Sequence, residues 1–391
     1  MRQELDLNTK VPVLSWAKPE DIDSGSLEQI KNLANLPFAY HHVALMPDVH
    51  VGYGMPIGGV LASVDYIVPN AVGVDIGCGM VAVKTSITKE EFLALRGEVG
   101  HEISRAIPRG FRKYSEPQDE DNEIFKNIPP IDLILREIGN AKLQLGTLGS
   151  GNHFIDVLFD ENNFIWIMLH SGSRNIGKQI ADYYNKKADE FTWQHFPSYP
   201  AHDLSALEIT SPMGREYIRA MEFAQKFAFE NRQTMLGKLK KAFTRFFPKI
   251  KFEQEINIHH NYARLEEHYG KQVWVHRKGA ISARIDELGI IPGSMGSNSY
   301  ITRGLGCAES FSSASHGAGR RMGRNEAKRQ FSIQDVQQEL AEKDIKLISE
   351  NNKGAIEEFT KAYKSIDDVI ENQKDLAEVL HTLFPLLVVI G

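Results

Sequence analysis

The sequence predicts an irregular α+β fold rather than a doubly wound parallel sheet. Apolar strand-like segments and segments of helical periodicity alternate along the chain, but without a regular strand–helix–strand rhythm. Glycine-rich turns follow several of the apolar segments, and these turns carry a His, Asp, Cys or Ser. With 391 residues, of which 42% are hydrophobic and 25% charged, the chain has the composition of an ordinary globular protein.

The N-terminal half contains the clearest strand and cap patterns. Residues 43–46 and 80–83 are short apolar runs that predict strands, and residues 164–169 predict a buried strand. Thr88 and Glu91 have the spacing of a capping box, which predicts that a helix begins after Thr88. Glycine-rich turns adjoin these strands, so the polar residues of the turns are expected at strand ends.

The C-terminal half is predicted to contain a long helical segment and further strands. Within a single domain, 1–391, residues 212–250 are expected to form a helical insertion, folded as a hairpin with a break at Gly237. Residues 272–284 predict a β-hairpin, and residues 386–390 predict a final apolar strand.

Composition and charge exclude several classes of protein. The sequence has no apolar run long enough for a transmembrane helix, and its first residues lack the pattern of a signal peptide. Two distant cysteines suit a reducing cytoplasm, so we expect a cytoplasmic protein with no membrane partner. The net charge of −6 argues against broad adhesion to nucleic acid, although it permits a local basic groove.

Candidate metal ligands stand at abrupt ends of apolar segments. Each alone has an ordinary explanation, because a lone histidine is usually a structural hydrogen bonder and a free cysteine is often a small buried thiol. Together, one thiolate, one carboxylate and several imidazoles exceed the needs of one tetrahedral zinc and suit two metal ions bridged by the sulfur. Such mixed donors admit zinc, manganese, iron or cobalt. The candidates are Asp75, Cys78, His153, His170 and the pair His259–His260.

Two glycine-rich loops and one histidine suggest phosphate chemistry. Residues 149–152 and 292–299 carry small residues whose backbone N–H groups could form anion nests, although both could be ordinary polar turns. Arg174 could clamp a phosphate with its planar guanidinium. His316, followed by Gly-Ala-Gly and two arginines, could attack a phosphoryl group, whereas the alternative is a helix N-terminus capped by Ser315.

A set of ordered motifs resembles those of RtcB-type RNA ligases. The resemblance runs from about residue 10 to the C-terminus and suggests a bacterial member. It implies mixed β-sheets around a deep central cleft that contains metal, with helices packed outside. The motifs are MPDVH at 46–50, VGVDIGCG at 72–79, LGSGNHF at 148–154, LHSGSR at 169–174, PGSMG at 292–296 and HGAGR at 316–320.

The resemblance implies an enzyme that depends on GTP and on two Mn²⁺ ions. Such ligases join RNA ending in a 3′-phosphate or a 2′,3′-cyclic phosphate to RNA with a 5′-hydroxyl, in RNA repair or tRNA splicing. An accessory activating protein is a further partner to consider, and we expect a monomer. The alternative is a metal-dependent 2′,3′-cyclic phosphodiesterase whose guanylylation is impaired.

The family pattern also implies a role for each matching residue. Asp75, Cys78, His153, His170 and His260 would hold the metal ions, and Cys78 would bridge them. His316 would take GMP, while Arg174 and Asp48 would act on the RNA end. The guanylate site would be lined by Asn152, Asp156, Asn261, Pro292, Gly293, Ser294, Met295, Ser299, Gly317, Ala318 and Gly319.

Two positions depart from the family pattern. Asp156 stands where the family commonly has the longer glutamate, so its reach toward a guanine is shorter. Ile390 stands where the family usually has a lysine that contacts the guanylate. A lost charge-assisted contact is worth roughly 1.5–3 kcal/mol, so GTP would bind about tenfold to a hundredfold more weakly or the nucleotide preference would change.

Overall fold

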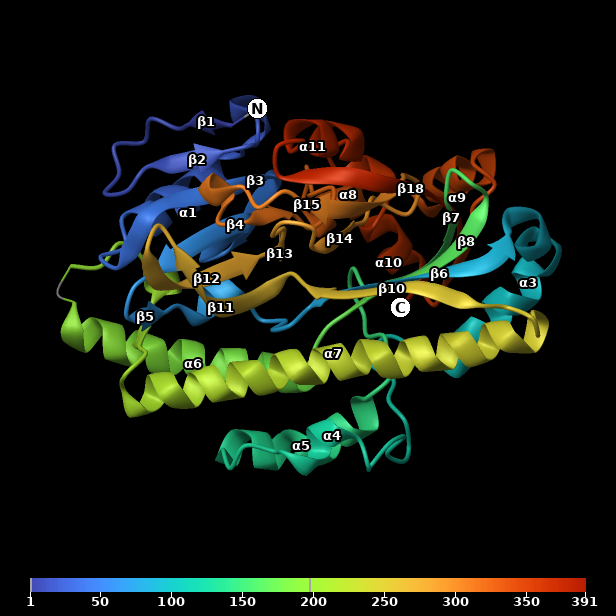
Figure 1. Cartoon of the computed structure of the whole chain (residues 1–391), viewed down its shortest axis with the longest axis horizontal. Helices are drawn as coiled ribbons and strands as arrows, with labels where there is room; N and C mark the ends of the chain where they lie inside the picture. The colour runs from blue at the N-terminus through green and yellow to red at the C-terminus, as the bar shows by residue number, and fades with distance from the viewer. Residues whose placement is uncertain (1, 197) are drawn as a thin grey trace.

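The computed structural model describes residues 2–196 and 198–391. Two large β-sheets lie side by side, and helices cover them from outside (Figure 1), which confirms the predicted α+β class. Among the described residues, none of the helices combines the length and the apolar character needed to cross a membrane.

The first sheet has six strands and is mostly antiparallel. Its order is β1-β2-β3-β4-β12-β11, and the β2–β3 pair is its parallel one. Helix α1 (Ser24–Ala34) packs against β3 and β4. The strands are β1 (Gln3–Glu4), β2 (Val13–Ser15), β3 (Ala39–Tyr53), β4 (Met55–Ser63), β11 (Asn261–His268) and β12 (Lys271–Lys278).

The second sheet has eight strands and carries most of the predicted apolar runs. Its order is β10-β6-β8-β7-β18-β15-β14, and β17 adds to β18 in parallel. The strands predicted at 80–83, 164–169 and 386–390 are confirmed as parts of β6, β8 and β18. The strands are β6 (Gly79–Thr88), β7 (Phe154–Phe159), β8 (Phe164–Ser171), β10 (Phe252–His259), β14 (Leu288–Ile291), β15 (Ser299–Gly304), β17 (Lys346–Ser349) and β18 (Ala377–Ile390).

The β-hairpin predicted over residues 272–284 is wrong. β12 pairs with β11 and β4, whereas β13 (Ala280–Ser282) pairs with β16 (Ser313–Ser315). Gly279 separates them with a φ of +62°, a conformation that glycine adopts readily, and the chain leaves the sheet there. The true hairpin is β11–β12, which turns through Tyr269 and Gly270, both with positive φ. A further small sheet pairs β5 (Tyr66–Ile67) with β9 (Leu207–Glu208).

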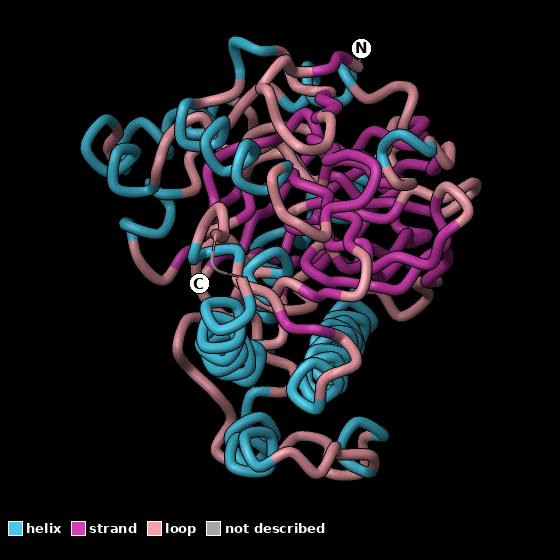
Figure 2. The backbone as a smooth tube through the Cα atoms, turned by 90° about the vertical axis from the view of Figure 1, so that its left-hand side faces the viewer, coloured by secondary structure: helices cyan, strands magenta, loops and turns pink. Residues whose placement is uncertain are grey.

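Helices α4 to α7 lie together on one side of the sheets, and the other labelled helices lie on other sides (Figure 1). In Figure 2, α6 and α7 are seen nearly end-on below the strands, with α4 and α5 beyond them. The capping box at Thr88 and Glu91 is confirmed at the start of α3. The helices are α2 (Pro69–Val72), α3 (Lys89–Ala106), α4 (Glu123–Lys126), α5 (Asp132–Gln144), α6 (Arg174–His195), α7 (Pro212–Phe246), α8 (Arg324–Gln330), α9 (Ile333–Glu342), α10 (Asn352–Glu357) and α11 (Ile366–Asn372).

The helical hairpin predicted over residues 212–250 is wrong, because α7 is one continuous helix. Gly237 does not break it, since a single glycine costs only about 1 kcal/mol in a helix and the apolar stripe continues past it. That stripe packs on two cores. Its first half meets α6 through Tyr217 and α4 through Phe227, and its second half meets β6, β8 and α3 through Leu239 and Phe243.

Candidate active site

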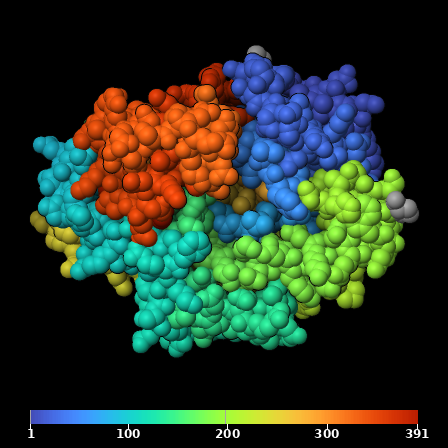
Figure 3. Space-filling view, turned by 180° about the vertical axis from the view of Figure 1, so that it is seen from behind, coloured from blue at the N-terminus to red at the C-terminus, as the bar shows by residue number. Residues whose placement is uncertain are grey.

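A cavity of about 650 Å³ opens between the two sheets. Figure 3 shows the molecule hollowed near its centre, between the blue N-terminal part, the green middle and the orange C-terminal part. The volume is suited to a nucleotide-sized ligand. Of the predicted site residues, the lining contains Asp75, Cys78, Asn152, Asp156, His170, Asn261, Pro292, Gly293, Ser294, Met295, His260, His316, Gly317, Ala318 and Gly319.

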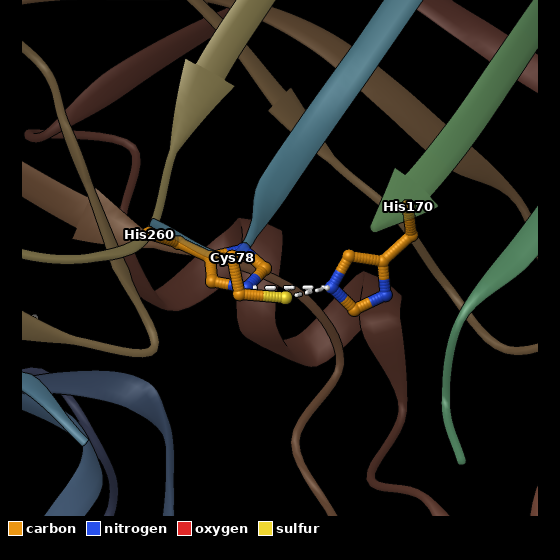
Figure 4. Close-up of side chains that lie close together, drawn as sticks. All are labelled: Cys78, His170 and His260. Atoms are coloured by element: carbon orange, nitrogen blue, oxygen red, sulfur yellow. Dashed lines mark hydrogen bonds between the residues drawn. The ribbon is translucent and has the colours of Figure 1, made fainter. Parts of the chain in front are cut away.

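Cys78, His170 and His260 meet at strand ends in the cavity floor (Figure 4). Cys78 directly precedes β6, and His170 is carried by the neighbouring strand β8. His260 follows β10, and its N–H donates to the Cys78 carbonyl at 2.8 Å. The Cys78 Sγ lies 3.2 Å from His170 Nε2, which lies 3.3 Å from His260 Nε2. The side chains therefore form one compact, buried donor group.

A second donor group shares the same sulfur. The Cys78 Sγ lies 3.5 Å from His153 Nε2, and that nitrogen lies 3.1 Å from Asp75 Oδ2. His153 and Asp75 thus form with Cys78 a second set that could hold a metal ion. Cys78 is common to both sets, so its sulfur could serve either candidate metal site. All five predicted metal ligands come together.

Hydrogen bonds to backbone carbonyls orient two of the imidazoles toward the Cys78 sulfur. His153 Nδ1 lies 2.9 Å from the Leu148 carbonyl oxygen, and His170 Nδ1 lies 2.9 Å from that of Asn152. Each Nδ1–H donates to its carbonyl, so the Nε2 lone pair faces the sulfur. Burial holds the pKa of His170 well below its usual range, because it disfavours the charged imidazolium. Burial raises the pKa of the Cys78 thiol, because it disfavours the charged thiolate. Metal cations would offset that cost and favour the thiolate.

The five candidate metal ligands, Asp75, Cys78, His153, His170 and His260, are called the metal-ligand cluster below. His316 stands beside this cluster and is oriented by Asp48. The His316 and His260 rings have centroids 4.7 Å apart. His316 Nδ1 lies 2.6 Å from Asp48 Oδ2, and its backbone N–H donates to the same oxygen at 3.2 Å. With the proton on Nδ1, the Nε2 lone pair is available as a nucleophile. The alternative of a helix cap at Ser315 is wrong, because Ser315 ends β16 and α8 begins only at Arg324.

Asp48 is fully buried, and its predicted role on an RNA end stays a prediction. The backbone of Gly319, with a φ of +73°, passes so close that a Cβ there would lie 2.3 Å from the Asp48 carbonyl oxygen. Position 319 therefore requires glycine, because any side chain there would collide with the backbone of Asp48. Asp48 is thus absent from the cavity lining, and its carboxylate contacts His316 instead.

Arg174 is the first residue of α6, and its side chain packs against the turn that precedes His153. Its Nε donates to Thr147 Oγ1 at 3.2 Å. A Cβ on Gly149 would lie 1.9 Å from the Arg174 Nη1, so only glycine leaves room for the guanidinium. The structure thus places the predicted arginine next to the 149–152 turn.

The part of the cavity predicted to bind the nucleotide contains the acidic residue Asp156 and the apolar residue Ile390. Asp156, on β7, is 6% exposed, and its Oδ1 has no hydrogen-bond partner among residues 2–196 and 198–391. Burial raises the pKa of Asp156 well above its usual range. Ile390 lies in the same wall and is 3% exposed. A ligand that donates hydrogen bonds would satisfy the Asp156 carboxylate.

The anion nest predicted at 292–299 is already partly filled by hydroxyl groups. The Gly293 N–H donates to Ser299 Oγ at 3.1 Å, and the Ser294 N–H donates to Ser297 Oγ at 2.7 Å. Ser299 is therefore buried behind the loop and does not itself line the cavity. It fixes the loop that presents Pro292 and Met295.

Arg232 on α7 was missed by the sequence reasoning, and it holds the segments that carry two of the ligands. This guanidinium is fully buried. Its Nη1 donates to the carbonyl of Gly77 at 2.9 Å and to that of Ser171 at 3.0 Å. Gly77 precedes Cys78 and Ser171 follows His170, so one side chain ties both ligand segments together.

Asn231, the preceding residue, holds the segment behind His153. Its Oδ1 accepts the Gly146 N–H at 2.7 Å, and its Nδ2 donates to the carbonyls of Thr147 at 3.1 Å and Gly172 at 3.2 Å. The available signal in the sequence is the polar Asn–Arg pair on the apolar stripe of the helix, where the periodicity predicts core residues.

Comparison with known proteins gives full-length matches. A family model described as tRNA-splicing ligase RtcB matches residues 29–131 and 115–391. The chain is 39% identical to the RNA-splicing ligase RtcB of Escherichia coli strain K12, over 100% of both chains. It is 32% identical to the tRNA-splicing ligase RtcB of Pyrobaculum aerophilum, over 93% of this chain and 90% of that one. It is 30% identical to the RNA-splicing ligase RtcB of Mycobacterium bovis, over 92% and 99%.

Proposed function

Because this chain belongs to the RtcB family of tRNA-splicing ligases, we propose that it joins RNA ends that carry a 3′-phosphate or 2′,3′-cyclic phosphate to ends that carry a 5′-hydroxyl. One observation carries the proposal. A histidine whose Nδ1 is bonded to a buried carboxylate stands beside a cluster of metal ligands in the same cavity. That arrangement suits a covalent nucleophile toward phosphorus.

The first step is the transfer of GMP from GTP to His316. The Nε2 lone pair attacks the α-phosphorus, a phosphorus–nitrogen bond forms, and pyrophosphate leaves. The Asp48 carboxylate stabilises the positive charge that develops on the imidazole, since it accepts the Nδ1–H. Asp156 would accept hydrogen bonds from the guanine, which offsets the cost of its burial.

We propose manganese as the metal, in two ions held by Asp75, Cys78, His153, His170 and His260. When bound, these ions supply positive charge that stabilises the phosphoryl oxygens. Manganese accepts the mixed oxygen, nitrogen and sulfur donors of this cluster, as do several other divalent ions.

Two further transfers would complete the joining. An oxygen of the RNA 3′-phosphate attacks the phosphorus on His316, the phosphorus–nitrogen bond breaks, and the RNA end leaves activated by GMP. The 5′-hydroxyl then attacks the activated 3′-phosphate, GMP leaves, and the hydroxyl proton passes to solvent. Arg174, close to the metal-ligand turns, would offset the charge of the RNA phosphate.

The hydrolase alternative is not favoured, because the relatives are named as ligases over their full length. A hydrolase that only opened cyclic phosphates would have no use for the His316–Asp48 pair. We further propose that the protein is a cytoplasmic monomer and that an accessory activating protein is a possible partner.

Retention of labelled nucleotide tests the proposal. The protein is incubated with Mn²⁺ and α-labelled GTP, then denatured, and the label that stays on the chain is measured. We expect label that is labile in acid, stable in alkali and absent from His316→Ala. When RNA with a 3′-phosphate and a 5′-hydroxyl partner is added before denaturation, the label should leave the chain and joined RNA should form. Opening of a cyclic phosphate without any retained label would instead establish the hydrolase.

A further inference from the structure

Three apolar side chains are unusually exposed beside the cavity. Val51 is 54% exposed, Tyr53 is 61% exposed and Val74 is 49% exposed. Val51 and Val74 both line the cavity, and Val74 directly precedes the candidate metal ligand Asp75. Tyr53 lies outside the lining, two residues after Val51 on β3, and its side chain is hydrogen-bonded to Asp203. Exposed apolar groups that gather at a cavity mouth mark a binding surface more often than scattered ones do. We call these three residues the apolar rim.

The apolar rim is held in place from below. Gly52 lies between Val51 and Tyr53 and makes two hydrogen bonds with the Gln29 side chain. Its N–H donates to Gln29 Oε1 at 3.1 Å, and its carbonyl accepts from Gln29 Nε2 at 2.8 Å. The buried Lys278 joins the two rim segments. Its ammonium donates to the carbonyls of Tyr53 and Asn70, and its aliphatic chain passes under the backbone of Gly73. The rim is thus ordered before any ligand arrives.

The surfaces around the apolar rim have a different character. The cavity floor carries the metal-ligand cluster, and another part of the lining carries exposed Arg321 and Arg324. Arg324 is paired with Glu358, whose carboxylate also lines the cavity. A ligand that fits this arrangement has a flat apolar part on one side and a phosphate on the other. A nucleotide within an RNA end has both, whereas an apolar peptide has no phosphate for the floor.

We propose that the apolar rim receives an unpaired base of an RNA end, so that the terminal phosphate is held over the metal-ligand cluster. Aromatic and apolar surfaces take bases by stacking, with little preference for sequence. The Tyr53 ring supplies the stacking face, and the two valines supply the wall against which the base packs. This inference rests on the proposed function, since it assigns the substrate's base to that same site.

A cycle of one protein change and one RNA change tests the contact. A short RNA with a 3′-phosphate, labelled at its far end, is compared with the same RNA lacking a base at each of the last few positions in turn. Binding is measured by fluorescence anisotropy for the native protein and for Tyr53→Ala. Tyr53→Phe, which keeps the ring, and Ile285→Ala, which removes an exposed apolar group outside the cavity lining, serve as controls.

We expect Tyr53→Ala to weaken binding of the intact RNA roughly tenfold, the scale of one stacked base. One abasic position should weaken binding to the native protein by the same factor and have no further effect on Tyr53→Ala. Both controls should bind like the native protein. Independent effects of the two changes, or an unchanged affinity in Tyr53→Ala, would overturn the proposal. Joining of the same RNAs is scored separately, so a protein that binds in this way but joins nothing would contradict the ligase function alone.

Discussion

The Asp48 carboxylate accepts the Nδ1–H of His316 across 2.6 Å, and this bond fixes which nitrogen of the imidazole carries the proton. We expect Asp48→Asn to lower the rate of guanylylation by about two to four orders of magnitude, because an amide N–H would face Nδ1 and move the proton to Nε2. The measurement is the rate at which label from α-labelled GTP accumulates on the chain. His316→Ala gives the zero point.

A matched variant separates orientation from folding in this experiment. His50→Gln changes a neighbour whose Nδ1 bonds the Asp48 carbonyl at 2.8 Å, but it leaves the carboxylate in place. Circular dichroism should find all three variants folded. If Asp48→Asn labels as fast as the native protein, the carboxylate does not set the tautomer.

The sharing of Cys78 between two donor groups predicts an asymmetric response to ligand removal. We expect the metal-free native protein to bind two Mn²⁺ ions, and His153→Ala or His260→Ala to bind one each. Cys78→Ala should weaken both sites, because both sets use its sulfur. Isothermal titration calorimetry measures the stoichiometry. Two ions bound by Cys78→Ala with native affinity would contradict a bridging thiolate.

Much of the site follows from local patterns, because four of the five predicted ligands lie at glycine-rich turns beside a strand and His260 directly follows β10. Cys78 precedes β6, and His170 lies near the end of β8, so strand pairing brings them together. The sequence pattern therefore identifies the residue types and their places. Their pairing partners depend on register, which local patterns do not determine. The same limit explains the wrong hairpin at 272–284, where each half pairs with a distant strand.

Long-range polar contacts lie beyond what periodicity can predict. The helical pattern at 212–250 identifies a helix, but its Asn231 and Arg232 make their contacts with segments far away in the sequence. Likewise, the spacing of Asp48 and His316 gives no sign that they touch. The family resemblance placed both in the site, but only the packed structure shows that Asp48 contacts His316.

The contacts of Arg232 predict that α7 sets the geometry of the metal-ligand cluster. We expect Arg232→Met to lower the affinity for Co²⁺ about tenfold to a hundredfold and to weaken the thiolate-to-cobalt absorption band, because the Gly77 and Ser171 carbonyls lose their common donor. Arg232→Lys should restore part of both. Cobalt is used because its spectrum reports the thiolate contact directly.

Phe243→Leu is the matched control for this test, since it perturbs the same helix in a core away from the cavity lining. It should lower the melting temperature while leaving the cobalt spectrum unchanged. If Arg232→Met and Phe243→Leu alter stability and spectrum in the same proportion, Arg232 is merely structural.

Lys278 predicts a dependence of stability on pH. Burial lowers the pKa of this ammonium to about 7, against an ordinary value near 10.4 in an unfolded chain. Between these values the unfolded chain binds more protons, so stability rises with pH across this window, and the full cost of burying the charge is present below pH 7. We expect the free energy of unfolding of the native protein, minus that of Lys278→Met, to increase by a few kcal/mol from pH 7 to 9.5. Urea unfolding of both proteins at both pH values measures this difference. An equal difference at pH 7 and pH 9.5 would contradict a lowered pKa for Lys278.

Ile390 and Asp156 are diagonal neighbours on the cavity face of the β7–β18 pair, because Asp156 pairs with Val388 and Ile390 pairs with Phe154. A cation at position 390 would lie within reach of a nucleotide held by Asp156, and it would favour the ionised form of that carboxylate. We expect Ile390→Lys to tighten binding of GTP about tenfold, the scale of one charge-assisted hydrogen bond. Ile390→Met controls for length without charge. Calorimetric titration with GTP in the presence of Mn²⁺ gives the affinities. If both variants bind GTP equally, charge at this position has no part in nucleotide recognition, and the cavity compensates for the isoleucine elsewhere.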